Sequence, residues 1–379
     1  MTKQFALAVL ALSAVTACSE NRDLTAPPPG PNSTTIQADQ LAGTATSGSI
    51  YTLTNQIAGN AVAVFRQAMD GSLTAQGSVS TGGLGSGSSL GSQGSLTLSD
   101  NGRWLLAVNA GSNDVSVFKV TEDGLELTDR VASGGTRPIS VTVAHNTVYA
   151  LNAGGTGNIS GFTLSEDGKL SPIAGSTRPL SGSAVNPAEV SFSTNGRWLV
   201  VTEKATNKLD VYAVDKSGVA GAPSFQSPAL AGSEPFGFAF GRRNELVVSE
   251  AATGSASSYV LGKSGTLSLV TGAAATHQGA PCWVAVTEDG RFAYTANAAS
   301  GTITGFSVSE GGSLGLLDAS GVTATVNAGA IDIAVGRGSR FLYQLDGSRI
   351  SAFRVTASGH LEPLGSIAKP TGSAGLAAL

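Results

Sequence analysis

The chain has 379 residues, of which 41% are hydrophobic and only 13% are charged, and glycine occupies 50 positions. Globular proteins usually carry about a quarter charged residues and ~7% glycine, so this composition excludes an acidic disordered chain and a coiled coil. The 22 Lys and Arg against 26 Asp and Glu give a net charge of −4, which offers no basic surface to a phosphate backbone. We therefore expect no nucleic-acid partner.

The first residues have the pattern of an export signal. Lys3 precedes an apolar run from Phe5 to Val15, which is too short for a permanent membrane span. The run ends in the sequence VTAC, which resembles the bacterial lipobox and would place a lipid on Cys18. We predict a signal peptide at residues 1–17 and an exported lipoprotein, held on the periplasmic or outer-surface side of a membrane by its lipid anchor alone. A plain secretory signal cut nearby is the alternative.

Residues 18–48 have the composition of a linker. They contain prolines at 27–29 and 31, scattered Ser, Thr, Asn and Gly, and no apolar period. We predict a flexible tether here, followed by one folded domain at residues 49–379.

The folded domain repeats a short pattern seven times. An aromatic residue ends each of seven alternating runs, and a glycine stands six residues after every one of them. The pairs are Phe65 and Gly71, Phe118 and Gly124, Phe162 and Gly168, Tyr212 and Gly218, Tyr259 and Gly265, Phe306 and Gly312, and Phe353 and Gly359. A glycine at this fixed distance predicts a tight turn with positive φ between two strands.

Two further strands precede each aromatic residue. One is a buried run that ends in a polar residue, such as 105–109 or 199–203, and before most of these runs lies another short apolar strand, such as 190–192. Seven units of four strands, spaced by 44 to 53 residues, are typical of a seven-bladed all-β propeller. The first unit lacks its innermost strand, so we predict that residues 373–379 pair with the strand that begins near Ile50 and close the ring. We expect a monomer.

The polar strand ends predict an acidic mouth on one face of the propeller. Glu189, Glu203 and Glu250 are candidate catalytic residues, Glu203 and Glu250 are candidate ligands for a divalent cation such as Ca²⁺, and Asp332 and Asp346 are candidate ligand-binding residues. The partner would be a small polar ligand, a glycan or a protein at this mouth. The alternative is that these side chains merely satisfy backbone groups of the loops.

Residues 276–283 add His277, Cys282 and Trp283 near the same face. His277 and Trp283 are candidate ligand-binding residues, with Trp283 as a stacking platform for a sugar. A Cys–His nucleophile pair is conceivable, but a buried structural cysteine is the simpler interpretation. The Gly- and Ser-rich stretch 80–94 lacks the Lys and helix of a phosphate loop, so we expect a mobile loop there.

The blade motifs resemble the lactonase family of seven-bladed propellers, which includes 6-phosphogluconolactonase and the 3-carboxymuconate cyclases. The resemblance is carried by residues 101–109, residues 289–297 and the repeated aromatic–glycine turns, and it covers about residues 50–379. It implies catalytic His, Arg and Glu residues at the starts of inner strands and at strand ends. This chain has Ile139 and Glu189 at the two matching His positions, Ala188 and Ala298 at the matching Arg positions, and Glu203–Lys204 at the Glu position. We therefore predict a binding or scaffold propeller, with a divergent lactonase-type hydrolase acting on a sugar lactone, or a cyclase, as the alternative.

Overall fold

The computed structural model describes residues 46–228 and 230–379, except for the side chains of residues 46 and 47. The predicted signal peptide, Cys18 and nearly all of the predicted tether lie outside the described residues. The first strand begins at Thr46 rather than at the predicted domain start of 49.

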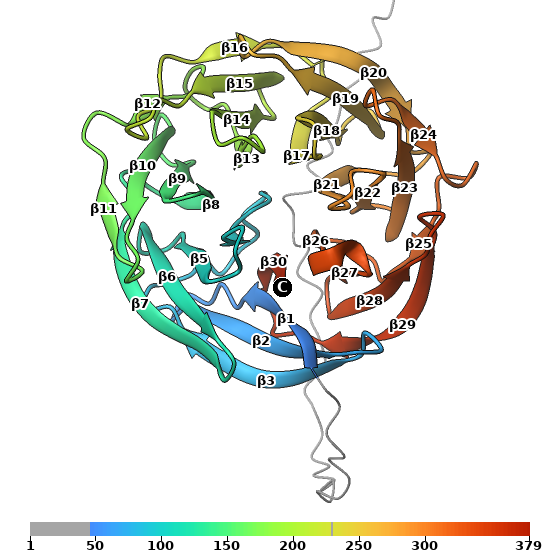
Figure 1. Cartoon of the computed structure of the whole chain (residues 1–379), viewed down its shortest axis with the longest axis horizontal. Coiled ribbons are helices and arrows are strands. Elements are labelled where there is room, and N and C mark those ends of the chain that lie inside the picture. The colour runs from blue at the N-terminus through green and yellow to red at the C-terminus, as the bar shows by residue number, and fades with distance from the viewer. Residues whose placement is uncertain (1–45, 229) are drawn as a thin grey trace, which may run out of the picture.

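Seven antiparallel sheets stand as blades around a central axis (Figure 1), which confirms the predicted propeller. The blades are numbered along the chain, and the strands of each are given from the innermost outward: blade 1 consists of β30 (Ala374–Ala378), β1 (Thr46–Leu53), β2 (Ala61–Ala68) and β3 (Leu73–Ser80), and blade 2 of β4 (Leu96–Leu98), β5 (Trp104–Asn109), β6 (Asp114–Thr121) and β7 (Gly124–Ala132). Blade 3 consists of β8 (Pro138–Ala144), β9 (Thr147–Asn152), β10 (Asn158–Leu164) and β11 (Leu170–Pro172), blade 4 of β13 (Pro187–Phe192), β14 (Trp198–Glu203), β15 (Lys208–Ala213) and β16 (Ser224–Gln226), and blade 5 of β17 (Pro235–Phe240), β18 (Glu245–Glu250), β19 (Ser255–Leu261) and β20 (Leu267–Ala275). Blade 6 consists of β21 (Pro281–Val286), β22 (Phe292–Asn297), β23 (Thr302–Val308) and β24 (Leu314–Leu316), and blade 7 of β26 (Asp332–Val335), β27 (Phe341–Leu345), β28 (Arg349–Val355) and β29 (Leu361–Ala368).

Three short elements complete the described part of the chain. Strands β12 (Arg178–Pro179) and β25 (Ala324–Thr325) each pair with the third strand of their blade, β10 and β23 respectively. The only helical element in the described ranges is a 3-10 turn at Arg337–Ser339. None of the described residues forms a helix long and apolar enough to cross a membrane.

Burial falls from the inner strands of a blade to its outer strand. In blade 2 every residue of β5 is buried, whereas β7 has no buried residue. The seven glycines that follow the aromatic residues all have positive φ, between 75° and 139°, as the sequence predicts. Several also pack against the preceding blade: a Cβ at Gly168 would lie 2.3 Å from the indole ring of Trp104. These glycines therefore both turn the chain and allow neighbouring blades to touch.

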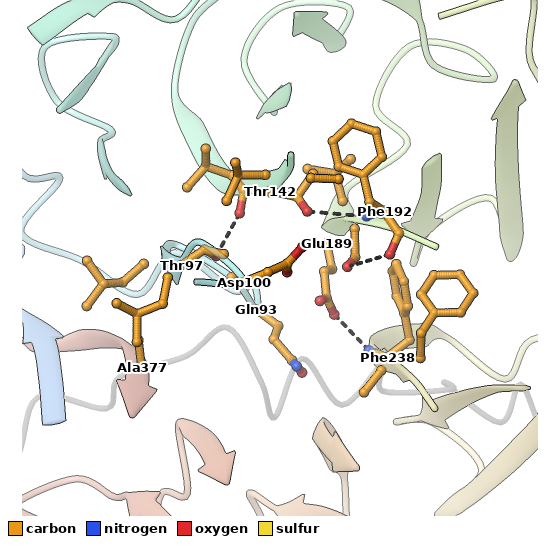
Figure 2. A pocket seen from close by; sticks show the side chains of 18 of the residues that line it. Gln93, Thr97, Asp100, Thr142, Glu189, Phe192, Phe238 and Ala377 are labelled. Atoms are coloured by element: carbon orange, nitrogen blue, oxygen red, sulfur yellow. Dashed lines mark hydrogen bonds between the residues drawn. The ribbon is translucent and has the colours of Figure 1, made fainter. Parts of the chain in front are cut away.

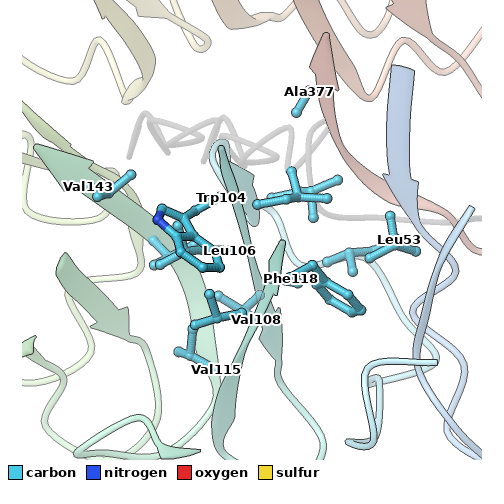
Figure 3. Packing of buried hydrophobic residues seen from close by; sticks show 14 of the residues in the cluster. Leu53, Trp104, Leu106, Val108, Val115, Phe118, Val143 and Ala377 are labelled. Atoms are coloured by element: carbon cyan, nitrogen blue, oxygen red, sulfur yellow. The ribbon is translucent and has the colours of Figure 1, made fainter. Parts of the chain in front are cut away.

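The hydrophobic core lies mainly between blades. The largest cluster joins blades 1, 2 and 3, and Figure 3 shows Leu53, Phe118 and Val143 contributing to it from successive blades. Because each blade buries both faces against its neighbours, a single blade could not retain this core alone. The ring as a whole is the stable unit.

The ring closes as predicted. Strand β30 pairs antiparallel with β1, with Ile50 opposite Ala378, Tyr51 opposite Ala377 and Leu53 opposite Ala374. This pairing completes blade 1 from two segments that are more than 300 residues apart, and it leaves no open seam between blades 1 and 7.

Candidate functional site

The innermost strands expose unpaired backbone groups toward the central axis, and side chains of the preceding blade satisfy many of them. Phe192 N–H of blade 4 donates to Thr142 Oγ1 of blade 3 at 3.2 Å, and Val190 N–H donates to Ser140 Oγ at the same distance. The same arrangement links blade 5 to blade 6, where Ser249 Oγ donates to the carbonyl of Cys282 at 2.8 Å. Since an unsatisfied buried backbone group costs about 1–3 kcal/mol, these contacts determine which polar side chains line the axis.

Two of these side chains are carboxyl groups. Glu189 Oε2 of blade 4 accepts a hydrogen bond from Phe238 N–H of blade 5 at 2.7 Å, and Asp332 Oδ2 of blade 7 accepts one from Leu376 N–H of β30 at 3.0 Å. Both carboxyl groups are buried. They are the two predicted acidic residues that the fold brings to the central axis.

A β-bulge explains why Glu189 lies apart from Glu203. In blade 4, Pro187 pairs with Glu203 but Glu189 pairs with Thr202, so Ala188 is an extra residue in β13. An extra residue reverses the alternation of side chains along a strand, and it turns Glu189 toward the axis. The expectation of one shared acidic face counted strand positions without this bulge.

The Gly- and Ser-rich stretch after β3 fills one end of the central channel. Its last part, residues 90–94, which we call the plug, lies between blades on opposite sides of the ring (Figure 1). Ser92 Oγ donates to the Ile139 carbonyl of blade 3 at 2.8 Å, while the Ser92 carbonyl accepts the Trp283 Nε1 hydrogen of blade 6 at 2.9 Å. Leu90 and Ser92 are buried. The prediction of a mobile loop was wrong for this part of the stretch.

Gln93 and Lys204 fasten the plug. The Gln93 amide pairs with β21 as a strand residue would, because Nε2 donates to the Val284 carbonyl at 2.8 Å and Oε1 accepts from Val284 N–H at 2.9 Å. Lys204 Nζ donates to the Gly91 carbonyl and lies 4.5 Å from the centre of the Phe236 ring. A Cβ at Gly237 would approach Gln93 Oε1 to 2.1 Å, so the plug fits only beside a glycine.

Beyond the plug the channel contains a cavity of about 420 Å³. Figure 2 shows Gln93 at its inner end and Glu189, Thr97 and Thr142 among its lining side chains. Exposed residues of the turns between first and second strands, including His145, line its outer end. The cavity therefore opens on the face that carries these turns, opposite the plug.

Burial favours the protonated form of both cavity carboxyl groups. Burial raises the pKa of Asp332 to about 8, against the opposing effect of its two backbone hydrogen bonds. Burial also raises the pKa of Glu189 well above its usual range, and the nearby Asp332 raises it further. A protonated carboxyl can donate one hydrogen bond and accept others, so the cavity presents neutral polar groups near neutral pH.

The strand-end acids lie elsewhere, buried within their own loops. Glu203 accepts hydrogen bonds from Ser181 and Thr206, and Glu250 accepts them from Ser255 and Ser257 at 2.7 and 2.8 Å. Asp346 accepts from the N–H groups at 348 and 349 and from Asn327. Each of these acids stabilises the turn that follows its strand, and the three do not share the cavity with Glu189 and Asp332.

The His277 segment does not line the cavity either. His277 is exposed, whereas Cys282 is fully buried with its Sγ 3.3 Å from the Ala280 carbonyl. Trp283 is buried against Phe236, with 5.2 Å between ring centres, and holds the plug through its indole N–H. Across the described ranges, no group of three or more His, Cys, Asp or Glu side chains is placed to hold a metal ion.

The fold and its capped channel define a seven-bladed β-propeller with a ligand-sized axial cavity. The model of the family "Lactonase, 7-bladed beta-propeller" matches residues 48–174 and 229–332, which is more than half of the chain. The protein belongs to this lactonase family.

Solved structures agree with this assignment at the level of the fold. The periplasmic gluconolactonase PpgL of Pseudomonas aeruginosa superposes with a TM-score of 0.69 at 17% identity, over 87% of this chain and 99% of that one. A Bacteroides fragilis protein assigned as a 6-phosphogluconolactonase gives 0.71 at 17% identity, over 90% and 100%. A Lactobacillus plantarum protein gives 0.72 at 17% identity, over 88% and 99%. No curated protein sequence matches the chain.

The plug contacts three of the positions that the family resemblance matches to catalytic residues, whereas another, Glu189, lines the cavity. Gln93 N–H donates to the Ala188 carbonyl at 3.1 Å, Ser92 reaches Ile139, and Gly91 accepts from Lys204. Ala298 is also buried. This end of the channel is thus filled by the chain's own residues, and only the opposite end leads to the cavity.

The raised pKa values of the cavity acids predict how stability depends on pH. Because folding raises these pKa values, the stabilisation is complete below the unfolded-state pKa of about 4 and is lost as pH rises toward 8. We expect the free energy of unfolding to fall between pH 5.5 and pH 8. In Glu189→Gln, which keeps an acceptor for Phe238 N–H, this fall should be smaller by at least ~1 kcal/mol.

Urea unfolding at the two pH values measures this effect, with the exposed Glu310→Gln as the control that should behave like wild type. An equal fall in wild type and Glu189→Gln would contradict the buried, protonated state of Glu189.

Proposed function

We propose that the protein is a lactonase-family propeller that binds a small, neutral polyhydroxy compound, such as a sugar or a sugar lactone, in the axial cavity. One observation carries the proposal: the cavity at the end of the channel opposite the plug presents two buried carboxyl groups, Glu189 and Asp332. Binding, rather than lactone opening by the family's residues, is the function that this arrangement supports best.

The chemistry of the cavity favours a neutral ligand. Its lining combines Glu189 and Asp332 with the hydroxyl groups of Thr97, Thr142 and Ser191. Protonated carboxyl and hydroxyl groups both donate and accept, which suits the hydroxyl groups of a sugar. None of the described lining residues is Lys or Arg, the usual partners of a phosphate group. A phosphorylated sugar therefore fits this cavity poorly.

A second candidate function is a divergent lactone hydrolase. It is favoured by the family membership and by the same two acids, since buried carboxyl groups of raised pKa in one cavity are groups that general acid–base catalysis uses. In that case a water molecule would add to the lactone carbonyl, and Glu189 would protonate the leaving ring oxygen and recover a proton from that water. The Ile139, Ala188 and Ala298 positions would have no part in the reaction.

Titration calorimetry with D-glucose, D-glucitol and 6-phosphogluconate tests the binding proposal. We expect the two neutral compounds to bind and Glu189→Gln to weaken binding by about tenfold, because a buried hydrogen bond to the ligand worth ~1.4 kcal/mol is lost. The phosphorylated compound should not bind. Tighter binding of 6-phosphogluconate than of both neutral compounds would contradict the proposal.

A pH-stat assay with D-glucono-1,5-lactone distinguishes the second candidate. Binding alone predicts hydrolysis at the uncatalysed rate, whereas turnover that falls by about 10²-fold or more in Glu189→Gln would establish the hydrolase. Turnover that is unchanged in Glu189→Gln would contradict both functions at this site.

We also propose that the protein is exported and anchored through Cys18, which lies outside the described residues. The proposal rests on the VTAC sequence after the apolar run, and one similar structure is that of a periplasmic enzyme. Cys18→Ser should move the protein from the membrane fraction to the soluble exported fraction, because acyl chains would supply the membrane affinity. A variant that stays in the membrane fraction would contradict the lipid anchor.

A further inference from the structure

Three blades share a polar pair between the end of the second strand and the third strand. The strand-end residue makes a hydrogen bond of 2.8–2.9 Å to a hydroxyl residue seven positions later in the chain. These pairs are Asn109 and Ser116 in blade 2, Glu250 and Ser257 in blade 5, and Asn297 and Thr304 in blade 6. A hydroxyl group suits this place because it can donate to a carboxylate or accept from an amide.

Blade 4 departs from this arrangement. Its strand-end residue is Glu203, and the residue seven positions later is Asp210, so a carboxyl group stands where the other blades have a hydroxyl. Both side chains are fully buried. No hydroxyl or N–H group of the described residues donates to Asp210 Oδ1, and the Asp210 carboxyl lies within hydrogen-bonding reach of the Glu203 carboxyl. Ionised carboxylates only accept hydrogen bonds. Two buried carboxyl groups at this place therefore require a positive charge between them, either a shared proton or a bound cation.

Further oxygen atoms surround the pair. Glu203 Oε2 lies in close contact with the hydroxyl groups of Ser181 and Thr206, and Tyr212 OH lies 3.4 Å from Asp210 Oδ2. Ser181 and Thr206 belong to loops and are only partly buried, so they place the cluster just beneath the surface.

We propose that Glu203 and Asp210, with the hydroxyl groups of Ser181 and Thr206, form a calcium-binding site in blade 4. Two carboxylates balance the charge of a divalent cation. Ca²⁺ takes six to eight oxygen ligands in flexible geometry, whereas Mg²⁺ demands a near-ideal octahedron and retains its waters. Carboxylate and hydroxyl oxygens from two loops and two strands match the first description. This site is separate from the axial cavity and does not depend on the ligand proposed there.

Terbium luminescence and thermal unfolding test the site in the purified protein. Tb³⁺ replaces Ca²⁺ at oxygen sites, and Tyr212 lies close enough to the carboxyl pair to sensitise its emission. We expect Tb³⁺ emission on tyrosine excitation, its displacement by Ca²⁺ but not by equal Mg²⁺, and a higher melting temperature with Ca²⁺. Asp210→Ser, which restores the pair found in blade 5, should fold and should lose at least about tenfold in Ca²⁺ affinity.

Two further variants complete the test. Glu203→Gln should lose Ca²⁺ binding as Asp210→Ser does. It provides the same test if Asp210→Ser fails to fold. Glu250→Gln, which alters the matching acid of blade 5, should leave the Ca²⁺ response unchanged. The weakest extracellular calcium sites have dissociation constants of ~1 mM. The proposal is overturned if wild type shows neither Tb³⁺ emission nor a thermal shift at cation concentrations up to about 10-fold above this value. It is overturned equally if either blade 4 variant binds Ca²⁺ as wild type does.

Discussion

The open edges of the innermost strands are the constraint on which the rest of this propeller depends. Each inner strand pairs on one side only, so its other edge presents N–H and C=O groups to the axis, where they need partners. Neighbouring blades supply them with side chains: Thr142 reaches Phe192, Glu189 reaches Phe238, and Asp332 reaches Leu376. The axis is polar for this reason, and the same side chains that join the blades also face the cavity.

The plug also provides hydrogen-bond partners for the open edges of the inner strands. Gln93 pairs with both backbone groups of Val284, and Ser92 joins blades 3 and 6 across the axis. In doing so the plug covers the end of the channel that carries Ile139 and Ala188, whereas Glu189 faces the accessible space at the other end. A structural requirement of the inner strands thus decides which face of this propeller can receive a ligand.

Much of the fold could be predicted from the sequence, because strand alternation and turn glycines are local signals. The fixed spacing from Phe118 to Gly124 and its six counterparts gave the blade number, and the unpaired last strand gave the closure. The site could not be predicted in the same way. The bulge at Ala188 separates Glu189 from Glu203. A bulge also follows the first proline of the inner strands at Pro138, Pro235 and Pro281, and simple alternation along a strand does not count this extra residue. The plug has a linker's composition, and its order comes from contacts that lie far away in sequence.

Amide hydrogen exchange at Val284 tests the central claim, that the plug is held by satisfying the open edge of an inner strand. In Gln93→Ala, Val284 N–H loses its partner, and its exchange should accelerate at least about tenfold, since ~1.4 kcal/mol of local protection is lost. The amide of Phe238, which donates to Glu189 rather than to Gln93, should exchange as in wild type. Unchanged exchange at Val284 in this variant would contradict the account.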